Sequence, residues 1–103
     1  MTVSLEASVR VGDDVVFREL DGEAVILNLQ SGVYFGLDAV GTRIWQLCQE
    51  HGSVRTVWEA MRREFDASAD TLQSDLFSFL DELATQGLVT IVAATASPVE
   101  KVP

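Results

Sequence analysis

The sequence predicts an α+β domain in which a three-stranded antiparallel β-meander is followed by three helices. Two observations predict this class. Short apolar segments separated by tight-turn dipeptides come first, and three amphipathic segments with recognisable helix ends follow them. The length of 103 residues fits one domain. We expect this domain to span residues 1–92, and the small residues and prolines beyond it predict a disordered tail at 93–103.

Three strands are predicted in the first third of the chain, after a start that we expect to be frayed through residue 10. They cover residues 14–20, 23–30 and 33–35. Asp21-Gly22 between the first two predicts a two-residue hairpin, because both central positions of a type I′ turn need positive φ. That turn sets Leu20 opposite Glu23.

A second tight turn at Ser31-Gly32 makes the third strand an edge of the meander. The register then sets Tyr34 opposite Leu29, and the pleat directs Tyr34 and Phe35 to opposite faces. We expect Tyr34 to face the core, because its cross-strand neighbour is apolar. Phe35 is then the side chain available to a partner chain.

Three helices are expected over residues 39–49, 54–65 and 69–86. Asp38 and Ser53 can cap the first two, and Gly52 and Gly87 end the first and the third. The third helix has one long apolar face, formed by Leu72, Leu76, Phe79, Leu80 and Leu83. A short last strand is predicted over residues 88–92.

The composition limits the classes of partner. Seven basic and sixteen acidic residues give a net charge of −9, which disfavours polyphosphates and anionic membranes. The longest uncharged apolar stretch, residues 87–96, is far shorter than the roughly 20 residues that span a bilayer. A single cysteine cannot form an internal disulfide. We expect a cytoplasmic protein that binds neither nucleic acid nor membrane.

The sequence offers few groups for catalysis. Cys48 lies on the apolar stripe of the first helix, where a free cysteine packs as a small hydrophobe. His51, the only histidine, lies at a helix end and is expected to be exposed. One cysteine and one histidine do not make a zinc site, and there is no glycine-rich phosphate loop. We predict a protein without catalytic residues, cofactor or metal.

One motif spans the third strand and the first helix, and consists of Gly32, Tyr34, Phe35, Leu37, Asp38, Gly41, Ile44 and Trp45. It resembles the signature of the PqqD-like family of peptide chaperones, recognition elements for ribosomally made precursor peptides that include the leader-binding subunit of lasso-peptide biosynthesis. The resemblance covers about residues 14–88 and implies a winged-helix-like fold. It also implies that a leader peptide lies as an added strand beside residues 33–36, in a groove formed with helix 69–86.

The edge strand leads to a compatible expectation from the residues alone. Its outward N–H and C=O groups have no partner within a meander, and added-strand binding uses such groups. Phe77 lies off the apolar face of the third helix, where it either lines a pocket beside the edge or packs against a neighbouring segment. The predicted peptide-binding residues are Ser31, Val33, Tyr34, Phe35, Gly36, Leu72, Gln73, Asp75, Leu76, Phe77, Phe79, Leu80 and Asp81.

We therefore expect a non-catalytic domain that binds a leader peptide and presents it to a modifying enzyme or a leader protease, as a monomer or weak homodimer. Two alternatives fit parts of the chain. Residues 79–89 look like the helix-to-wing junction of a DNA-binding winged helix, although helix 69–86 has four acidic residues and no Lys or Arg. The edge strand also suits a homodimeric assembly module. The acidic helix favours a basic or amphipathic peptide.

Overall fold

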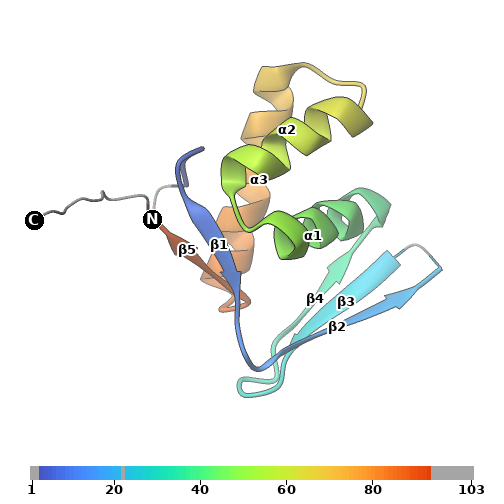
Figure 1. Cartoon of the computed structure of the whole chain (residues 1–103). Helices are drawn as coiled ribbons and strands as arrows, with labels where there is room; N and C mark the ends of the chain where they lie inside the picture. Colours follow the sequence, from blue (N-terminus) through green and yellow to red (C-terminus); the bar gives the residue numbers. More distant parts are fainter. Residues whose placement is uncertain (1–2, 22, 94–103) are drawn as a thin grey trace, which may run out of the picture.

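The computed structural model describes residues 3–21 and 23–93. Its elements in chain order are β1 (Ser8–Val11), β2 (Val15–Leu20), β3 (Glu23–Asn28), β4 (Tyr34–Leu37), α1 (Ala39–His51), α2 (Val54–Glu64), α3 (Ala69–Thr85) and β5 (Val89–Val92). The helices lie on one side of a three-stranded sheet, β2-β3-β4, and β1 and β5 form a separate pair (Figure 1). The predicted meander followed by three helices is confirmed. Except for Ala93, the predicted tail lies outside the described residues.

The β2–β3 hairpin has the predicted register. Leu20 pairs with Glu23, and Val16 pairs with Leu27. Asp21 has a φ of 56°, as the first central position of a type I′ turn requires. The pairs from Val15 opposite Asn28 to Leu20 opposite Glu23 follow the alignment that the sequence predicts.

The β3–β4 hairpin differs from the prediction by two residues, because Tyr34 pairs with Leu27 and not with Leu29. Asn28 organises a longer loop. Its side-chain Oδ1 atom accepts hydrogen bonds from the backbone N–H groups of Gln30 and Ser31, at 2.9 and 3.1 Å. Gly32, with a φ of 77°, donates its N–H to the Asn28 carbonyl at 2.8 Å. Because side chains alternate with a period of two, a shift of two residues does not change which residues share a face of the sheet.

The helices cover the face of the sheet that carries Phe17, Ala24, Ile26, Phe35 and Leu37. The ring of Phe17 stacks on Trp45 of α1, which is fully buried, with ring centroids 6.2 Å apart. Tyr34 lies on the opposite, outer face and is 72% exposed, whereas Phe35 is half-buried against the core. The prediction that Tyr34 faces the core is therefore wrong. An apolar cross-strand neighbour does not reveal which face the helices will cover.

The N-terminal segment is ordered against the body of the domain, and the prediction of a frayed start is wrong. β1 pairs antiparallel with β5, with Val9 opposite Ile91. The N–H of Val9 also donates to the carbonyl of Gly52, in the turn between α1 and α2, at 2.7 Å. Ala7 and Val9 are buried. The partner strand lies at the other end of the chain, so no local turn signal indicates this pairing.

The helices α1 and α2 begin after the predicted caps, Asp38 and Ser53, and Ser68 caps α3 in the same way. At each N-terminus the side chain of the capping residue accepts the backbone N–H of the residue three positions later. Gly52 and Gly87, with φ of 75° and 77°, follow the ends of α1 and α3. No helix among residues 3–21 and 23–93 is long and apolar enough to cross a membrane.

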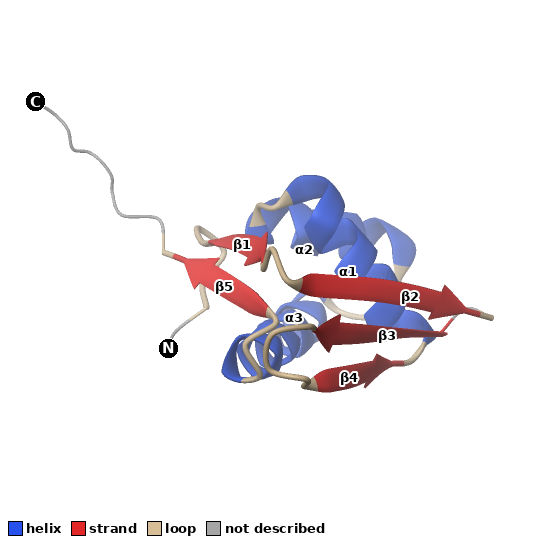
Figure 2. Cartoon of the chain, turned by 90° about the horizontal axis from the view of Figure 1, so that it is seen from below, coloured by secondary structure: helices blue, strands red, loops and turns tan. Residues whose placement is uncertain are grey.

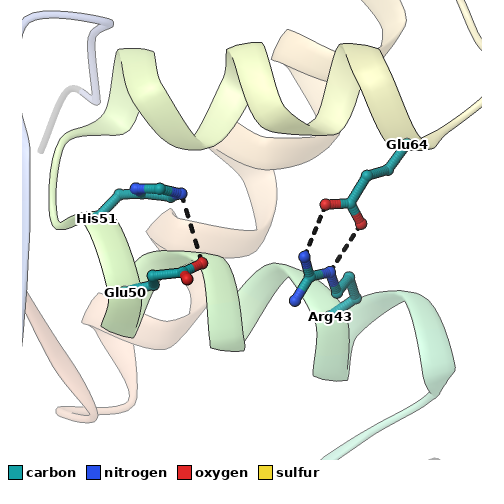
Figure 3. Close-up of polar contacts among 4 residues, drawn as sticks. All are labelled: Arg43, Glu50, His51 and Glu64. Carbon is teal, nitrogen blue, oxygen red and sulfur yellow. Dashed lines mark hydrogen bonds and ion pairs between the residues drawn. The ribbon is translucent and has the colours of Figure 1, made fainter.

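A two-point ion pair joins α1 to the end of α2 (Figure 3). The Nε and Nη2 atoms of Arg43 donate to the two carboxylate oxygens of Glu64, each at 2.7 Å. This hydrogen bonding lowers the pKa of the Glu64 carboxyl and raises the pKa of Arg43, because each charged form is stabilised by the other. His51, at the end of α1, lies 3.5 Å from the carboxylate of Glu50 and is exposed, as predicted.

Cys48 is part of the core, as predicted. Only 3% of the residue is exposed, and burial raises the pKa of its thiol to about 12. Desolvation disfavours the thiolate, which is the nucleophilic form of cysteine. The side chain therefore contributes to packing, and its thiolate form is disfavoured at neutral pH.

The ion pair predicts a stability that depends on pH. Glu64→Gln should cost no more than about 1 kcal/mol at pH 7, because the pair is partly exposed. The pKa of Glu64 is lower in the folded protein than in the unfolded chain, so its contribution is complete above the unfolded value and is lost as pH falls through the folded value. Urea unfolding of both proteins across the acid range should show their difference shrinking. Glu59→Gln, on the same helix but outside the pair, is the control, and a pH-independent difference would contradict the ion pair.

The buried thiol predicts a difference in reactivity between folded and unfolded protein. At pH 8 the native protein should react with iodoacetamide much more slowly than the urea-unfolded protein, because the folded state keeps Cys48 protonated and covered. Mass spectrometry of timed samples measures this. Comparable rates in the two states would show that the thiol is accessible.

Candidate functional site

β4 is a free edge of the three-stranded sheet. In the part of the chain that the structure describes, no strand pairs with its outer side (Figure 2). Two hydrogen bonds fix the pattern of pairing: the N–H of Leu29 donates to the Asp14 carbonyl, and the N–H of Asn28 donates to the Val33 carbonyl, both at 2.8 Å. Alternate residues of β3 therefore bond to β2 and to β4.

This alternation decides which backbone groups of β4 point outward. In register with β3, Phe35 pairs with Ile26 as a hydrogen-bonded pair, so its N–H and C=O are used within the sheet. Tyr34 and Gly36 belong to the other set, and their N–H and C=O groups point to the free edge. The edge thus offers the backbone groups of two residues to an added strand.

A groove of about 280 Å³ lies beside this edge. β4, the first turns of α1 and one side of α3 form its walls. Its lining is largely apolar, with two carboxylates, and consists of Phe35, Gly36, Leu37, Asp38, Val40, Gly41, Ile44, Asp75 and Phe79. Gly41 leaves room for the capping carboxylate and for the end of β4, because a Cβ at this position would lie 3.3 Å from the Asp38 Oδ1 atom and 3.4 Å from the Leu37 Cδ2 atom.

The charge of the groove is negative. Asp38 uses its Oδ1 atom to cap α1, where it accepts the N–H of Gly41 at 2.8 Å. Asp75 is exposed on α3 and forms no ion pair within the described ranges. Since α3 contains no Lys or Arg, nothing on this helix balances its acidic residues. The groove suits an apolar side chain with a basic group nearby.

Four of the predicted peptide-binding residues line the groove, and they are Phe35, Gly36, Asp75 and Phe79. The predicted leucines of α3 are core residues instead, since Leu72, Leu76 and Leu80 are buried. The remaining predicted residues lie elsewhere. Ser31 and Val33 precede β4, Tyr34 is on the outer face, and Gln73 and Asp81 do not line the groove.

Phe77 does not belong to the groove. Phe77 and Phe79 are both half-buried and both pack against the core, but only Phe79 also lines the groove beside β4. Two residues along a helix correspond to a rotation of roughly 200°, so the two rings lie on nearly opposite sides of α3. The sequence did not decide between the two positions of Phe77, and the structure packs it against the core and outside the groove.

Sequence reasoning missed five groove residues: Leu37, Asp38, Val40, Gly41 and Ile44. Four of them, Leu37, Asp38, Gly41 and Ile44, belong to the motif that carries the resemblance. The motif was therefore a usable signal. Among the residues described, no group of three His, Cys, Asp or Glu side chains could hold a metal ion.

Comparison with known proteins gives matches over these same elements. The family model for PqqD, coenzyme PQQ synthesis protein D, matches residues 23–89. The solved structure of TbiB1 in complex with the TbiA(beta) leader peptide is 41% identical, covers 78% of this chain and 93% of that chain, and has a TM-score of 0.74. A lasso peptide synthetase B1 complexed with the leader peptide is 19% identical, covers 81% and 98% of the two chains, and has a TM-score of 0.73. No curated protein matches the chain.

The matched region contains β3, β4 and all three helices, which together form the free edge and the groove. At 19% identity, the second structure shows a shared fold. The family model covers well over half of the sequence, and the structure at 41% identity is covered almost completely. The chain belongs to the PqqD family.

Proposed function

We propose that this domain binds the leader segment of a ribosomally made precursor peptide as an added strand along β4, and presents it to a modifying enzyme or a leader protease. The observation that carries the proposal is the free edge at Tyr34 and Gly36 directly beside the groove between β4 and α3. The complex of TbiB1 with the TbiA(beta) leader peptide supports it, because TbiB1 is 41% identical to this chain.

Binding would combine main-chain and side-chain contacts. The backbone groups of Tyr34 and Gly36 would exchange hydrogen bonds with the peptide, and these bonds do not depend on its sequence. Selectivity would come from peptide side chains that enter the groove against Phe35 and Phe79. Asp75 on the groove wall would favour a peptide with Lys or Arg close to its apolar anchors.

The proposal gives the domain no catalytic role. Cys48 is buried with a raised thiol pKa, and His51 lies at the opposite end of α1 from the groove. General acid–base or nucleophilic catalysis needs a positioned pair of such groups beside a substrate pocket. The groove contains apolar side chains and carboxylates only.

The charge of α3 favours a peptide over DNA. The helix that would enter the major groove carries Asp70, Asp75, Asp81 and Glu82 and no basic residue. Phosphate contacts depend on Lys and Arg, so this helix would be repelled by a duplex. A homodimer formed through β4 would use the same edge as the peptide, and the two modes of binding would compete.

Strand addition predicts a localised NMR response. When the ¹⁵N-labelled domain is titrated with the TbiA(beta) leader peptide, the largest amide shifts should fall on residues 34–36 and on Asp75 and Phe79. α2 lies away from the groove and should change little. Binding with shifts confined to α2 or to β1 and β5 would contradict the proposed site.

The outward N–H of Tyr34 provides a test of backbone pairing. Tyr34→Pro removes this donor at the first residue of β4, a position where proline is tolerated in a strand. Tyr34→Ala removes the same side chain but keeps the donor, and it is the matched control. The proline variant should bind the TbiA(beta) leader peptide about tenfold more weakly than the alanine variant, since a hydrogen-bonding group of the peptide loses its partner.

The helical circular dichroism of the two variants should be equal, because Tyr34 is exposed and outside the core. Phe35 is unsuitable for this test, since its backbone groups pair with β3 and proline there would damage the sheet itself. Equal affinities of the proline and alanine variants would argue against strand addition at β4.

A further inference from the structure

No helix or strand of the described residues covers the face of the three-stranded sheet opposite the helices (Figure 2). This face carries exposed apolar side chains. Leu20 and Tyr34 are 76% and 72% exposed, and Val25 is 42% exposed. Gathered apolar surface of this kind marks interaction sites on soluble proteins. The groove beside α3 lies on the other side of β4 and does not account for this face.

A hollow of about 540 Å³ lies on the outer face next to β4. Its floor is a row of paired residues across the three strands, Gly36, Val25 and Arg18, with Leu20 and Glu23 at its border. The hollow exists because Gly36 leaves a gap in this row. A Cβ at Gly36 would meet no atom within 4 Å, and the residue is not among the glycines with positive φ.

A strand added to β4 would place one of its side chains over this hollow. The backbone groups of Gly36 point to the free edge, so an antiparallel peptide forms a hydrogen-bonded pair with it. Directly opposed residues have side chains on the same face, so the peptide residue opposite Gly36 lies on the outer face. A large side chain opposite a glycine can pack across it onto the next strand, here onto Val25.

We infer that the hollow over Gly36 is a specificity pocket for one large apolar side chain of the bound peptide, preferably an aromatic one. The inference rests on the proposed function. Arg18, at the far end of the floor, and Glu23, at the border, offer hydrogen-bonding partners for a polar group at the tip of an aromatic ring. The ring itself would cover Val25 and Leu20, which are otherwise exposed.

Two observations favour a peptide side chain over a second copy of the domain. The hollow is continuous with the edge, because Gly36, Leu37 and Asp38 line both the hollow and the groove on the other face. The net charge of −9 opposes the association of two identical chains.

The peptide is thus read on both faces of the extended sheet. The residue opposite Gly36 enters the hollow, and the next residue along the peptide points into the groove towards Phe35 and Phe79. Recognition therefore requires two consecutive anchor residues in the peptide, and the two side chains are bound in different surroundings. The outer anchor packs on aliphatic side chains beside Arg18, and the inner anchor packs on aromatic rings near Asp75.

Filling the hollow tests this pocket. Gly36→Ala, Gly36→Val and Gly36→Leu occupy increasing amounts of it, and Thr90→Val changes an exposed position of β5 as the matched control. Affinity for the TbiA(beta) leader peptide should fall with side-chain size, by roughly tenfold or more for leucine. Thr90→Val should bind as the unaltered domain does. Thermal unfolding should show that the Gly36 variants are folded, because a Cβ at this position would meet no atom within 4 Å and Gly36 does not have a positive φ.

A double-mutant cycle then locates the side chain that occupies the hollow. Each residue of the peptide is replaced by alanine and titrated against the unaltered domain and Gly36→Val. One replacement should cost roughly tenfold or more on the unaltered domain, but less than about threefold on Gly36→Val.

Three other outcomes would overturn the inference. If every alanine replacement in the peptide lowers affinity equally for the unaltered domain and for Gly36→Val, the hollow does not bind a peptide side chain. Strand addition at β4 would not be contradicted by that result. Absence of peptide binding to the unaltered domain would overturn the proposed function as well. Light scattering that shows a peptide-free dimer, dissociated by Gly36→Val, would assign the outer face to a second copy of the chain.

Discussion

The packing of α1 against one face of the three-stranded sheet determines where this protein can bind a partner. Ile26 and Trp45 are fully buried at this contact, and Phe17 stacks on Trp45. In a strand, side-chain direction and backbone hydrogen-bonding direction alternate with the same period. Once Phe35 is turned towards α1, its backbone is therefore committed to β3. Tyr34 and Gly36 then present both their side-chain positions to the outer face and their backbone groups to the edge.

A free sheet edge can pair with the edge of another protein molecule, and two features of this domain disfavour such association: a short edge strand and a negative charge. β4 has four residues and offers two of them outward. The net charge is strongly negative, and the neighbouring α3 is acidic, so copies of the chain repel one another. Few main-chain bonds are then available to a ligand. Affinity must come largely from side-chain pockets, and the structure has a hollow on each side of β4.

The remaining elements stabilise this arrangement without entering the site. β1 and β5 bring the two ends of the described chain together and hold the turn at Gly52. The Arg43–Glu64 ion pair connects α1 to the end of α2 (Figure 3). Trp58 donates its Nε1–H to the carbonyl of Ala69 at 3.0 Å, which connects α2 to the start of α3. Two of the elements that form the groove, α1 and α3, are therefore each connected to α2 by a separate polar contact.

The sequence by itself determined the features that depend on neighbours along the chain. Asp21 at positive φ fixed the β2–β3 register, and the caps at Asp38 and Ser53 fixed where helices begin, because turns and helix ends involve residues a few positions apart. The motif around β4 indicated the family for the same reason. For the candidate site, the sequence predicted an edge strand and a helix beside it, but only some of the residues that line the groove.

Only the tertiary structure decided which side of those elements is used. The covered face of the sheet, and with it the exposure of Tyr34, depends on where α1 packs. The choice of Phe79 over Phe77 depends on the rotation of α3 about its own axis, and the pairing of β1 with β5 joins opposite ends of the chain. Each of these follows from contacts between distant segments, which local periodicity and turn chemistry do not encode.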